Sequence, residues 1–391
     1  MIGPSKVIAN NFEIMQYMVG CYVQLSVKVT PSKVSEIVDE ISKKAICCRT
    51  TFDGKQYKYT NKPCPTFRIP DNFPHLEYAH TYASEHHTIP AEQRLGCICY
   101  NSDTVILNSN HTSADGGYLK MLLDHLCGRK TPKDQQYRIH ESIIDALSNE
   151  FHKVNGPIST HTTPVRNYKV PQSNKRAQFN LIEFPFKNRQ SAFTYKLLAA
   201  TTLVTSAYNG FLGTMACHTA VDARRLLKNP DWKHVNIDGL VVSDAHTDIG
   251  TNFSKMTVGE LQKRFKTDLM NKINNGELLN VIKHVRDNTY VFPNYATISM
   301  SNIGILRTEG DVKDAMITFS VTNGPFPPGN LQLSSTCINN ELFRGRLFTS
   351  PFVTSDEESK KFSRAIEHFL VNVDESESVK DVFTDLVRIL N

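Results

Sequence analysis

Residues 108–119 read NSNHTSADGGYL, a polar segment followed by the start of an apolar one. This stretch places His111 and Asp115 four residues apart and follows them with Gly116 and Gly117. This spacing suits a general base whose loop is organised by a carboxylate. The two glycines favour a strained turn or a close backbone approach, because glycine also adopts positive φ. The motif alone is more often an ordinary loop histidine beside an Asx turn.

The segments on either side of the motif indicate a strand and a helix. Val105, Ile106 and Leu107 form an apolar run before it, and leucines at helical spacing follow it, with Gly128 where a helix would end. We therefore expect the motif to occupy a sharp turn between two packed elements.

Strands and helices alternate along the rest of the chain. Period-two patterns predict strands, and apolar residues at 3.6-residue spacing predict helices. In the first half we expect a helix at 31–44 and strands at 21–29, 45–52, 56–60, 66–70, 96–100 and 104–110. In the second half we expect helices at 191–209, 257–275, 355–371 and 376–390, and strands at 179–186, 211–221, 295–302, 315–323 and 331–339. This mixture predicts an α/β (α+β) fold with mixed sheets.

The length predicts two domains. A chain of 391 residues exceeds the ~100–200 residues that one core usually serves. Residues 156–178 are rich in Pro, Ser, Thr and basic residues without apolar periodicity, as in an exposed connection. We therefore expect an N-terminal domain over 1–165, carrying the His-x-x-x-Asp-Gly motif, and a C-terminal domain over 166–391.

Composition argues against several classes of protein. The chain is 40% hydrophobic with no apolar run near the ~20 residues of a membrane span. Its charge of +5 is not gathered into the basic stripe of a nucleic-acid binder. Nine cysteines without a C-x-x-C pair, behind an N-terminus without a signal-peptide pattern, favour reduced thiols. We expect a cytoplasmic, monomeric protein without a membrane span, a nucleic-acid partner or a metal.

Three other histidine segments compete with His111 for a catalytic role. His86 and His87 lack a carboxylate at the same spacing and suggest a loop. Residues 218–222 repeat the His-x-x-x-Asp spacing but lack the glycines. Residues 244–248, DAHTD, could be imagined as a metal site but are more typical of solvated side chains in a polar loop.

Four segments together resemble one known family. KAICCRTTF (44–52), NHTSADGG (110–117), TAVDARRLL (219–227) and SMSNIG (299–304) occur in its order. They resemble the CoA-dependent acyltransferase superfamily, which includes chloramphenicol acetyltransferase, peptide-synthetase condensation domains and alcohol O-acetyltransferases. Asn110 stands where the family often has a first histidine, and the D-F-G-W-G motif of plant BAHD enzymes is absent. The resemblance is therefore nearest the alcohol O-acetyltransferase branch.

This resemblance implies a fold and an activity. The fold would be two chloramphenicol-acetyltransferase-like domains forming a pseudo-dimer with a tunnel between them. The activity would be O-acyl transfer from acyl-CoA as co-substrate to a small-molecule alcohol, with acetyl-CoA as the expected donor and without a permanently bound cofactor. Transfer from a carrier-protein thioester and a non-catalytic binding module are the alternatives, and the absence of a recognisable carrier segment favours free CoA.

The resemblance also implies roles for individual residues. His111 would be the general base, and Asp115 would pair with Arg224, with Arg225 as the runner-up, to hold the turn that Gly116 and Gly117 shape. Strand alternation places Ser299 and Ser301 on one face and Asn302 on the other. By resemblance Ser301 would donate to the oxyanion, with Asn302 in support; residues that contact CoA are not predicted.

Overall fold

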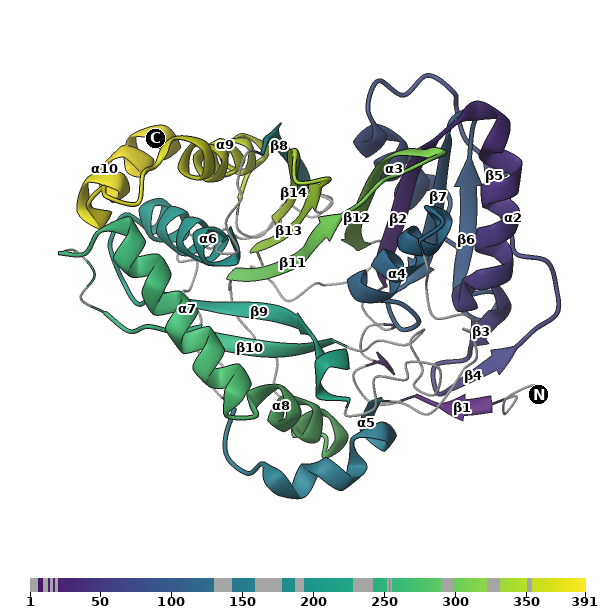
Figure 1. Ribbon diagram of the computed structural model, residues 1–391, viewed down its shortest axis with the longest axis horizontal. Helices are drawn as coiled ribbons and strands as arrows, with labels where there is room; N and C mark the ends of the chain where they lie inside the picture. The colour runs from purple at the N-terminus through teal and green to yellow at the C-terminus, as the bar shows by residue number, and fades with distance from the viewer. Residues whose placement is uncertain are drawn as a thin grey trace.

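Two large β-sheets stand side by side and frame the molecule (Figure 1). The first has five strands, in the order β12 (Val312–Val321), β2 (Cys21–Val29), β7 (Thr104–Asn110), β6 (Gly96–Tyr100) and β5 (Thr66–Arg68). The second has six, in the order β10 (Val242–Asp248), β9 (Ala216–Asp222), β11 (Ile298–Leu306), β13 (Leu331–Ile338), β14 (Leu342–Thr349) and β8 (Gln178–Pro185). Both sheets mix parallel and antiparallel pairs.

Smaller elements complete the framework. A three-stranded sheet joins β1 (Lys6–Ile8), β4 (Gln56–Tyr59) and β3 (Thr50–Phe52). The α-helices are α2 (Val34–Lys44), α3 (Leu76–His86), α4 (Gly116–Leu126), α5 (Ile143–Ala146), α6 (Phe193–Asn209), α7 (Val258–Asn274), α8 (Glu277–Arg286), α9 (Asp356–Asn372) and α10 (Val379–Leu390). The 3-10 turns are η1 (Pro31–Lys33), η2 (Ile46–Arg49), η3 (Ser148–Lys153) and η4 (Ala223–Leu226).

The computed structural model describes most of the chain. The described residues are 6–9, 13–14, 17, 20–129, 143–158, 178–186, 193–227, 242–251, 253, 255–289, 298–321, 331–349 and 354–391. The predicted domain boundary at 165 and most of the predicted linker lie outside them, so the division into 1–165 and 166–391 stays a prediction.

Strand β2 shows why the five-stranded sheet has two different faces. Val23, Leu25 and Val27 point to one side, where they join the apolar cluster that includes residues of α2 and α4. Gln24 and Ser26 point to the other side and are also buried. Because alternate residues of a strand face opposite sides, one strand serves an apolar core and a polar layer.

Helix α3 covers the polar side of this sheet. The Ser26 hydroxyl lies 2.8 Å from Nδ1 of His80 on α3. His86 is the last residue of the same helix, so our interpretation of His86 and His87 as a loop is wrong for His86, while His87 is the residue at which the helix ends. The helix contributes polar groups on more than one side, which leaves its sequence without a clear apolar stripe.

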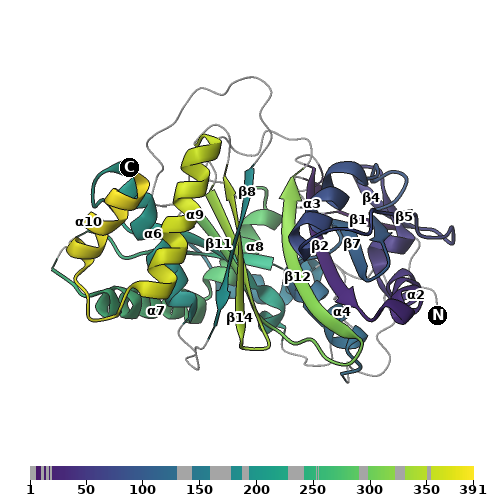
Figure 2. The same cartoon turned by 90° about the horizontal axis from the view of Figure 1, so that it is seen from above.

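The six-stranded sheet is also two-faced. Its apolar face carries Cys217, Met300, Leu333 and Leu347, which pack with residues of α6, α7, α9 and α10. Figures 1 and 2 show these four helices on the side away from the five-stranded sheet. The opposite, polar face therefore turns toward the first half of the chain.

Strand β12 connects the two halves. It follows β11 of the six-stranded sheet in sequence, yet it pairs antiparallel with β2, from Val312 opposite Val29 to Val321 opposite Cys21. Figure 2 shows β12 beside β2 at the edge of the first half. Residues from the predicted C-terminal domain thus complete the sheet of the predicted N-terminal domain.

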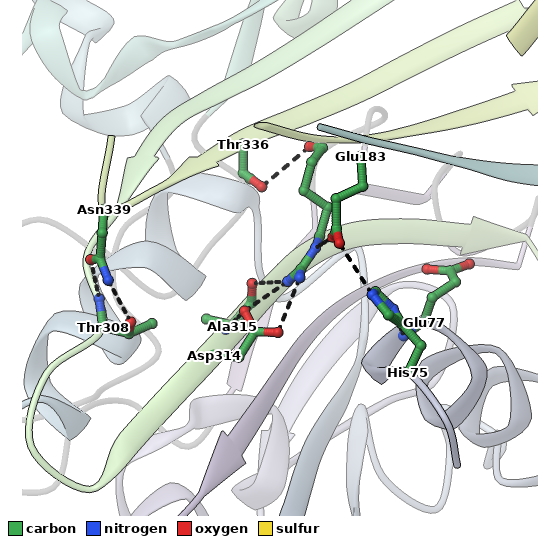
Figure 3. Close-up of polar contacts among 9 residues, drawn as sticks. His75, Glu77, Glu183, Thr308, Asp314, Ala315, Thr336 and Asn339 are labelled. Carbon is green, nitrogen blue, oxygen red and sulfur yellow. Dashed lines mark hydrogen bonds and ion pairs between the residues drawn. The ribbon is translucent and has the colours of Figure 1, made fainter. Parts of the chain in front are cut away.

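Buried arginines on β14 fasten β12 and α3 to the six-stranded sheet. Arg344 lies 2.6 Å from Glu183 of β8 and contacts both carboxylate oxygens of Asp314 at 2.8 and 3.0 Å. Glu183 in turn lies 3.3 Å from Nε2 of His75, the residue that caps α3 (Figure 3). Each charge in this network has an opposite neighbour, as burial of ionised groups requires.

A second buried arginine makes a similar contact. Arg346 donates to Glu77 of α3 at 2.8 Å and to the carbonyl of Phe319 on β12 at 3.1 Å. Its side chain is only 3% exposed, so the pair is shielded from solvent. These polar contacts set the position of the two halves.

The predicted helices at 257–275 and 31–44 begin differently. Helix α7 begins with a capping box in which the Thr257 hydroxyl accepts from the Glu260 amide and the Glu260 carboxylate accepts from the Thr257 amide. The helix predicted at 31–44 begins as the 3-10 turn η1 before α2. No helix in the described part of the chain has both the length and the apolar character needed to cross a membrane.

Candidate active site

The His111 turn joins the end of β7 to the start of α4 and is held by hydrogen bonds on all sides. The His111 amide donates to the carbonyl of Cys21 on β2 at 2.8 Å. The Asn110 side chain accepts from the Thr112 amide at 3.0 Å, and the Tyr57 hydroxyl donates to the Thr112 carbonyl at 3.0 Å. Asn110, the departure from the doubled-histidine pattern, thus braces the turn.

The hydrogen bond of the His111 ring fixes its tautomer. Nδ1 lies 2.8 Å from the Ala114 carbonyl, which can only accept, so Nδ1 carries the proton and Nε2 keeps its lone pair. Burial lowers the pKa of His111 below its usual value, against opposing effects of the Ala114 carbonyl and of Asp115. The half-buried ring is therefore neutral near pH 7 and can accept a proton through Nε2.

Asp115 caps α4 and binds an arginine from the other half of the chain. Its Oδ1 accepts from the Tyr118 amide at 2.8 Å and from Nη1 of Arg224 at 3.0 Å. Arg224 lies in η4 and also contacts Asp222 at 3.1 Å. Both members of the Asp115–Arg224 pair are buried, whereas Arg225 is exposed. Asp115 thus links the start of α4 to Arg224 of η4.

The two glycines leave room for this contact and for strand β11. A Cβ on Gly117 would stand 2.6 Å from Nη1 of Arg224, and one on Gly116 would stand 2.9 Å from the Ile303 side chain. Both glycines are the first residues of α4 and neither has a positive φ. Close approach therefore explains both glycines, and our alternative explanation by positive φ is wrong.

Strand β11 brings the predicted Ser301 toward the same region. An irregularity between Asn302 and Gly304 lets Ile303 reach Gly116. Asn302 donates to the Thr194 hydroxyl at 2.9 Å and accepts from the Gly304 amide at 3.0 Å, so it secures the irregular segment. Ser301 is half-buried, two residues before Ile303.

One polar cluster on β9 and β10 was misjudged from the sequence. Residues 244–248, interpreted as a polar loop, lie in strand β10, where Asp244 and His246 are 5% and 0% exposed. Nε2 of His218 lies 2.9 Å from Oδ1 of Asp244. VSDAHTD has no period-two alternation of apolar and polar residues, so it carries no strand signal. Among the described residues, no three metal-binding side chains are grouped as a metal site.

Comparisons with known proteins identify the fold. No protein-family model matches the sequence, and no curated protein matches it significantly. The starter condensation domain of rhizomide synthetase, a variant crystallised with C8-CoA, matches at a TM-score of 0.65 and 11% identity over 96% of this chain and 97% of that one. A further variant of that domain, crystallised with C8-CoA and Leu-SNAC, matches at a TM-score of 0.64 and 11% identity, over 96% of this chain and 96% of that chain.

A solved structure called CT matches at a TM-score of 0.56 and 12% identity, over 97% of this chain and 94% of that chain. The chain thus has the two-domain, condensation-domain-like fold with mixed sheets that we predicted. At this identity the likeness concerns the fold alone.

Proposed function

We propose that the protein is an acyl-CoA-dependent O-acyltransferase that moves an acyl group, acetyl in the first instance, to a hydroxyl acceptor. The main support for this proposal is the hydrogen bonding of the His111 ring. Its Nδ1 donates to the Ala114 carbonyl, so its Nε2 keeps a lone pair that can accept a proton. The similarity in fold to a condensation domain crystallised with C8-CoA supports a thioester donor.

His111 supplies the base in this mechanism. An alcohol attacks the thioester carbonyl carbon while Nε2 of His111 takes the hydroxyl proton. The new C–O bond gives a tetrahedral oxyanion, and collapse of that intermediate breaks the C–S bond. His111 then returns the proton to the departing CoA thiolate, which leaves as the free thiol. Proton transfer of this kind typically contributes ~10²–10⁴-fold.

Ser301 is our proposed donor to the oxyanion. Its hydroxyl would donate a hydrogen bond to the negatively charged oxygen that develops from the thioester carbonyl, and loss of one such donor typically costs roughly 2.7–4 kcal/mol. Asn302 and Thr194 hold the irregular strand on which Ser301 lies. Asp115 and Arg224 act on the turn rather than on the substrate.

Release of free CoA thiol tests the function. Purified protein, an alcohol panel and either acetyl-CoA or octanoyl-CoA should give alcohol-dependent thiol release together with the ester. The variant His111→Ala should lose at least ~10²-fold in kcat/KM, whereas the control His368→Ala, a position on α9, should not. Retention of most activity in His111→Ala would show that the assigned base is wrong.

Transfer from a carrier-protein thioester is the second candidate, because the solved structures matched include condensation domains. The two candidates differ in the donor. An acyl-pantetheine carrier that outperforms acyl-CoA at equal concentration, with the same dependence on His111, would favour the second.

A further inference from the structure

Three neighbouring side chains form a polar cluster on the inner face of the six-stranded sheet. In the register of β10 and β9, His246 lies opposite His218, and Asp244 lies opposite Ala220. Residues directly opposite each other in a sheet point to the same side. His218, Asp244 and His246, named here the histidine cluster, therefore share the polar face.

The histidine cluster contains a buried ring for which the described residues offer no hydrogen-bonding partner. Both ring nitrogens of His246 are buried and have no partner among the described residues, and His246 is 0% exposed. The ring centroids of His218 and His246 are 4.8 Å apart, and the side chain of His218 keeps 15% of its surface exposed. A buried ring nitrogen without a hydrogen bond costs free energy, and a bound ligand could supply that hydrogen bond.

The register places the cluster close to the proposed oxyanion donor. On the parallel pair β11 and β9, Ser299 lies opposite His218, and Ser301 lies opposite Ala220. Ser301 lies on the strand next to His218 and two residues further along it. The distance between their Cα atoms is therefore about 8 Å. The same strand β9 leads into η4 and Arg224, which touches the His111 turn.

The charges of the cluster suit an uncharged polar ligand. Burial and the neighbouring His218 lower the pKa of His246 to about 3, so its ring is neutral and offers one N–H and one lone pair. Burial acts to lower the pKa of His218, but Asp244 outweighs it and raises that pKa. The nearby Lys272 is paired with Glu277 at 3.3 Å. The Asp244 carboxylate offsets any positive charge on His218, so the pair has no net positive charge for a phosphate or a carboxylate to bind.

We propose that the histidine cluster binds a second hydroxyl group of the acceptor, several bonds away from the reacting hydroxyl, because His218 lies on the order of 8 Å from Ser301 between Cα atoms. This inference rests on the proposed function and narrows it: the preferred acceptors are diols or longer polyols. A hydroxyl both donates and accepts, so it can give its hydrogen to one imidazole nitrogen and accept from another N–H. His246 and His218 would then determine specificity, while His111 remains the base.

Acceptors matched in length test the proposal. We compare 1,6-hexanediol with 1-hexanol and with 1,2-hexanediol, whose second hydroxyl is too near the first to reach the cluster. In the wild-type protein, kcat/KM should favour 1,6-hexanediol by roughly tenfold over both, the effect of about one net hydrogen bond. An absent preference, with measurable transfer to all three, would overturn the proposal.

Variants locate the preference. His246→Phe keeps a ring of similar size and removes both nitrogens, and it should bring the ratio for 1,6-hexanediol over 1-hexanol close to one. His218→Gln is the second variant, in case His246→Phe folds poorly, and should also lower the ratio. The control His368→Phe on α9 should leave it unchanged. A raised KM for acyl-CoA with an intact diol preference would assign the cluster to the donor and overturn the proposal.

Equilibrium binding separates this inference from the proposed function. Saturation-transfer NMR reports the binding of 1,6-hexanediol and 1-hexanol to the whole protein without turnover. If the wild-type protein transferred no acyl group to any alcohol, the proposed function would fail. A diol preference in binding that disappears in His246→Phe would still support the site, and equal binding would refute it.

Discussion

The buried pair of Asp115 and Arg224 should dominate the stability of the His111 turn. The two side chains are 5% and 2% exposed and lie 3.0 Å apart. In the variant Arg224→Met, the Asp115 carboxylate stays buried without its cation. Removing one partner of a buried pair typically costs about 3–5 kcal/mol in free energy of unfolding. The adjacent Arg225 is exposed, so Arg225→Met should change stability by less than ~0.5 kcal/mol.

Urea unfolding followed by circular dichroism measures this difference. With an m-value of ~3 kcal/mol/M, the expected loss lowers the midpoint of Arg224→Met by about 1–1.7 M. The midpoint of Arg225→Met should stay within ~0.2 M of the wild type. Thiol release should fall in parallel for Arg224→Met, because the turn that aims His111 loses its brace.

A second substitution tests the assigned cause. Asp115→Asn keeps a good helix cap for the Tyr118 amide but removes the charge. Added to Arg224→Met, it should recover part of the lost stability, because the uncompensated carboxylate is gone. The reasoning would be refuted if Arg224→Met resembled Arg225→Met, or if Asp115→Asn were equally harmful in both backgrounds.

Three further outcomes are expected. Gly117→Ala should lower the urea midpoint by the equivalent of about 1–3 kcal/mol, because its Cβ would stand 2.6 Å from Nη1 of the buried Arg224; an unchanged midpoint would contradict the close approach. The kcat/KM should rise with pH with a midpoint below 6.5, because only neutral His111 accepts a proton and burial lowers its pKa; a midpoint above 6.5 in a pH–rate profile would contradict this. Thr257→Ala should cost about 1 kcal/mol in urea unfolding through loss of the capping box with Glu260, and Lys255→Ala serves as the control.

Strong local patterns made much of the fold predictable. The alternation in 21–29 and the leucine spacing after the motif correspond to β2 and α4. Two of the elements that we missed, α3 and β10, bury polar side chains such as His80 on α3 and Asp244 and His246 on β10, so their apolar pattern is weak. Two others, α8 and β14, bury apolar residues and were missed all the same.

The braced turn of the candidate site was predictable, and its wider geometry was less so. The spacing of His111 and Asp115 indicated a turn organised by the carboxylate, and the contact with Arg224 came from the family resemblance. The role of His111 as a base stays a prediction. The spatial reason for Gly117 depends on a guanidinium more than a hundred residues away in sequence, which local spacing does not contain. The same holds for the histidine cluster, because its members meet only through strand register.

The crossover of β12 has a consequence for synthesis of the chain. Strand β2 is synthesised by residue 29, but one of its edges is paired only by residues 312–321 of β12. The backbone groups along that edge therefore have no partner strand until β12 has been made. While the ribosome makes the intervening residues, this edge stays open to pairing with other nascent chains. Closure of so long a loop also makes folding slow. The first half therefore reaches its final form only near the end of translation, which favours expression conditions that slow aggregation over those that speed synthesis.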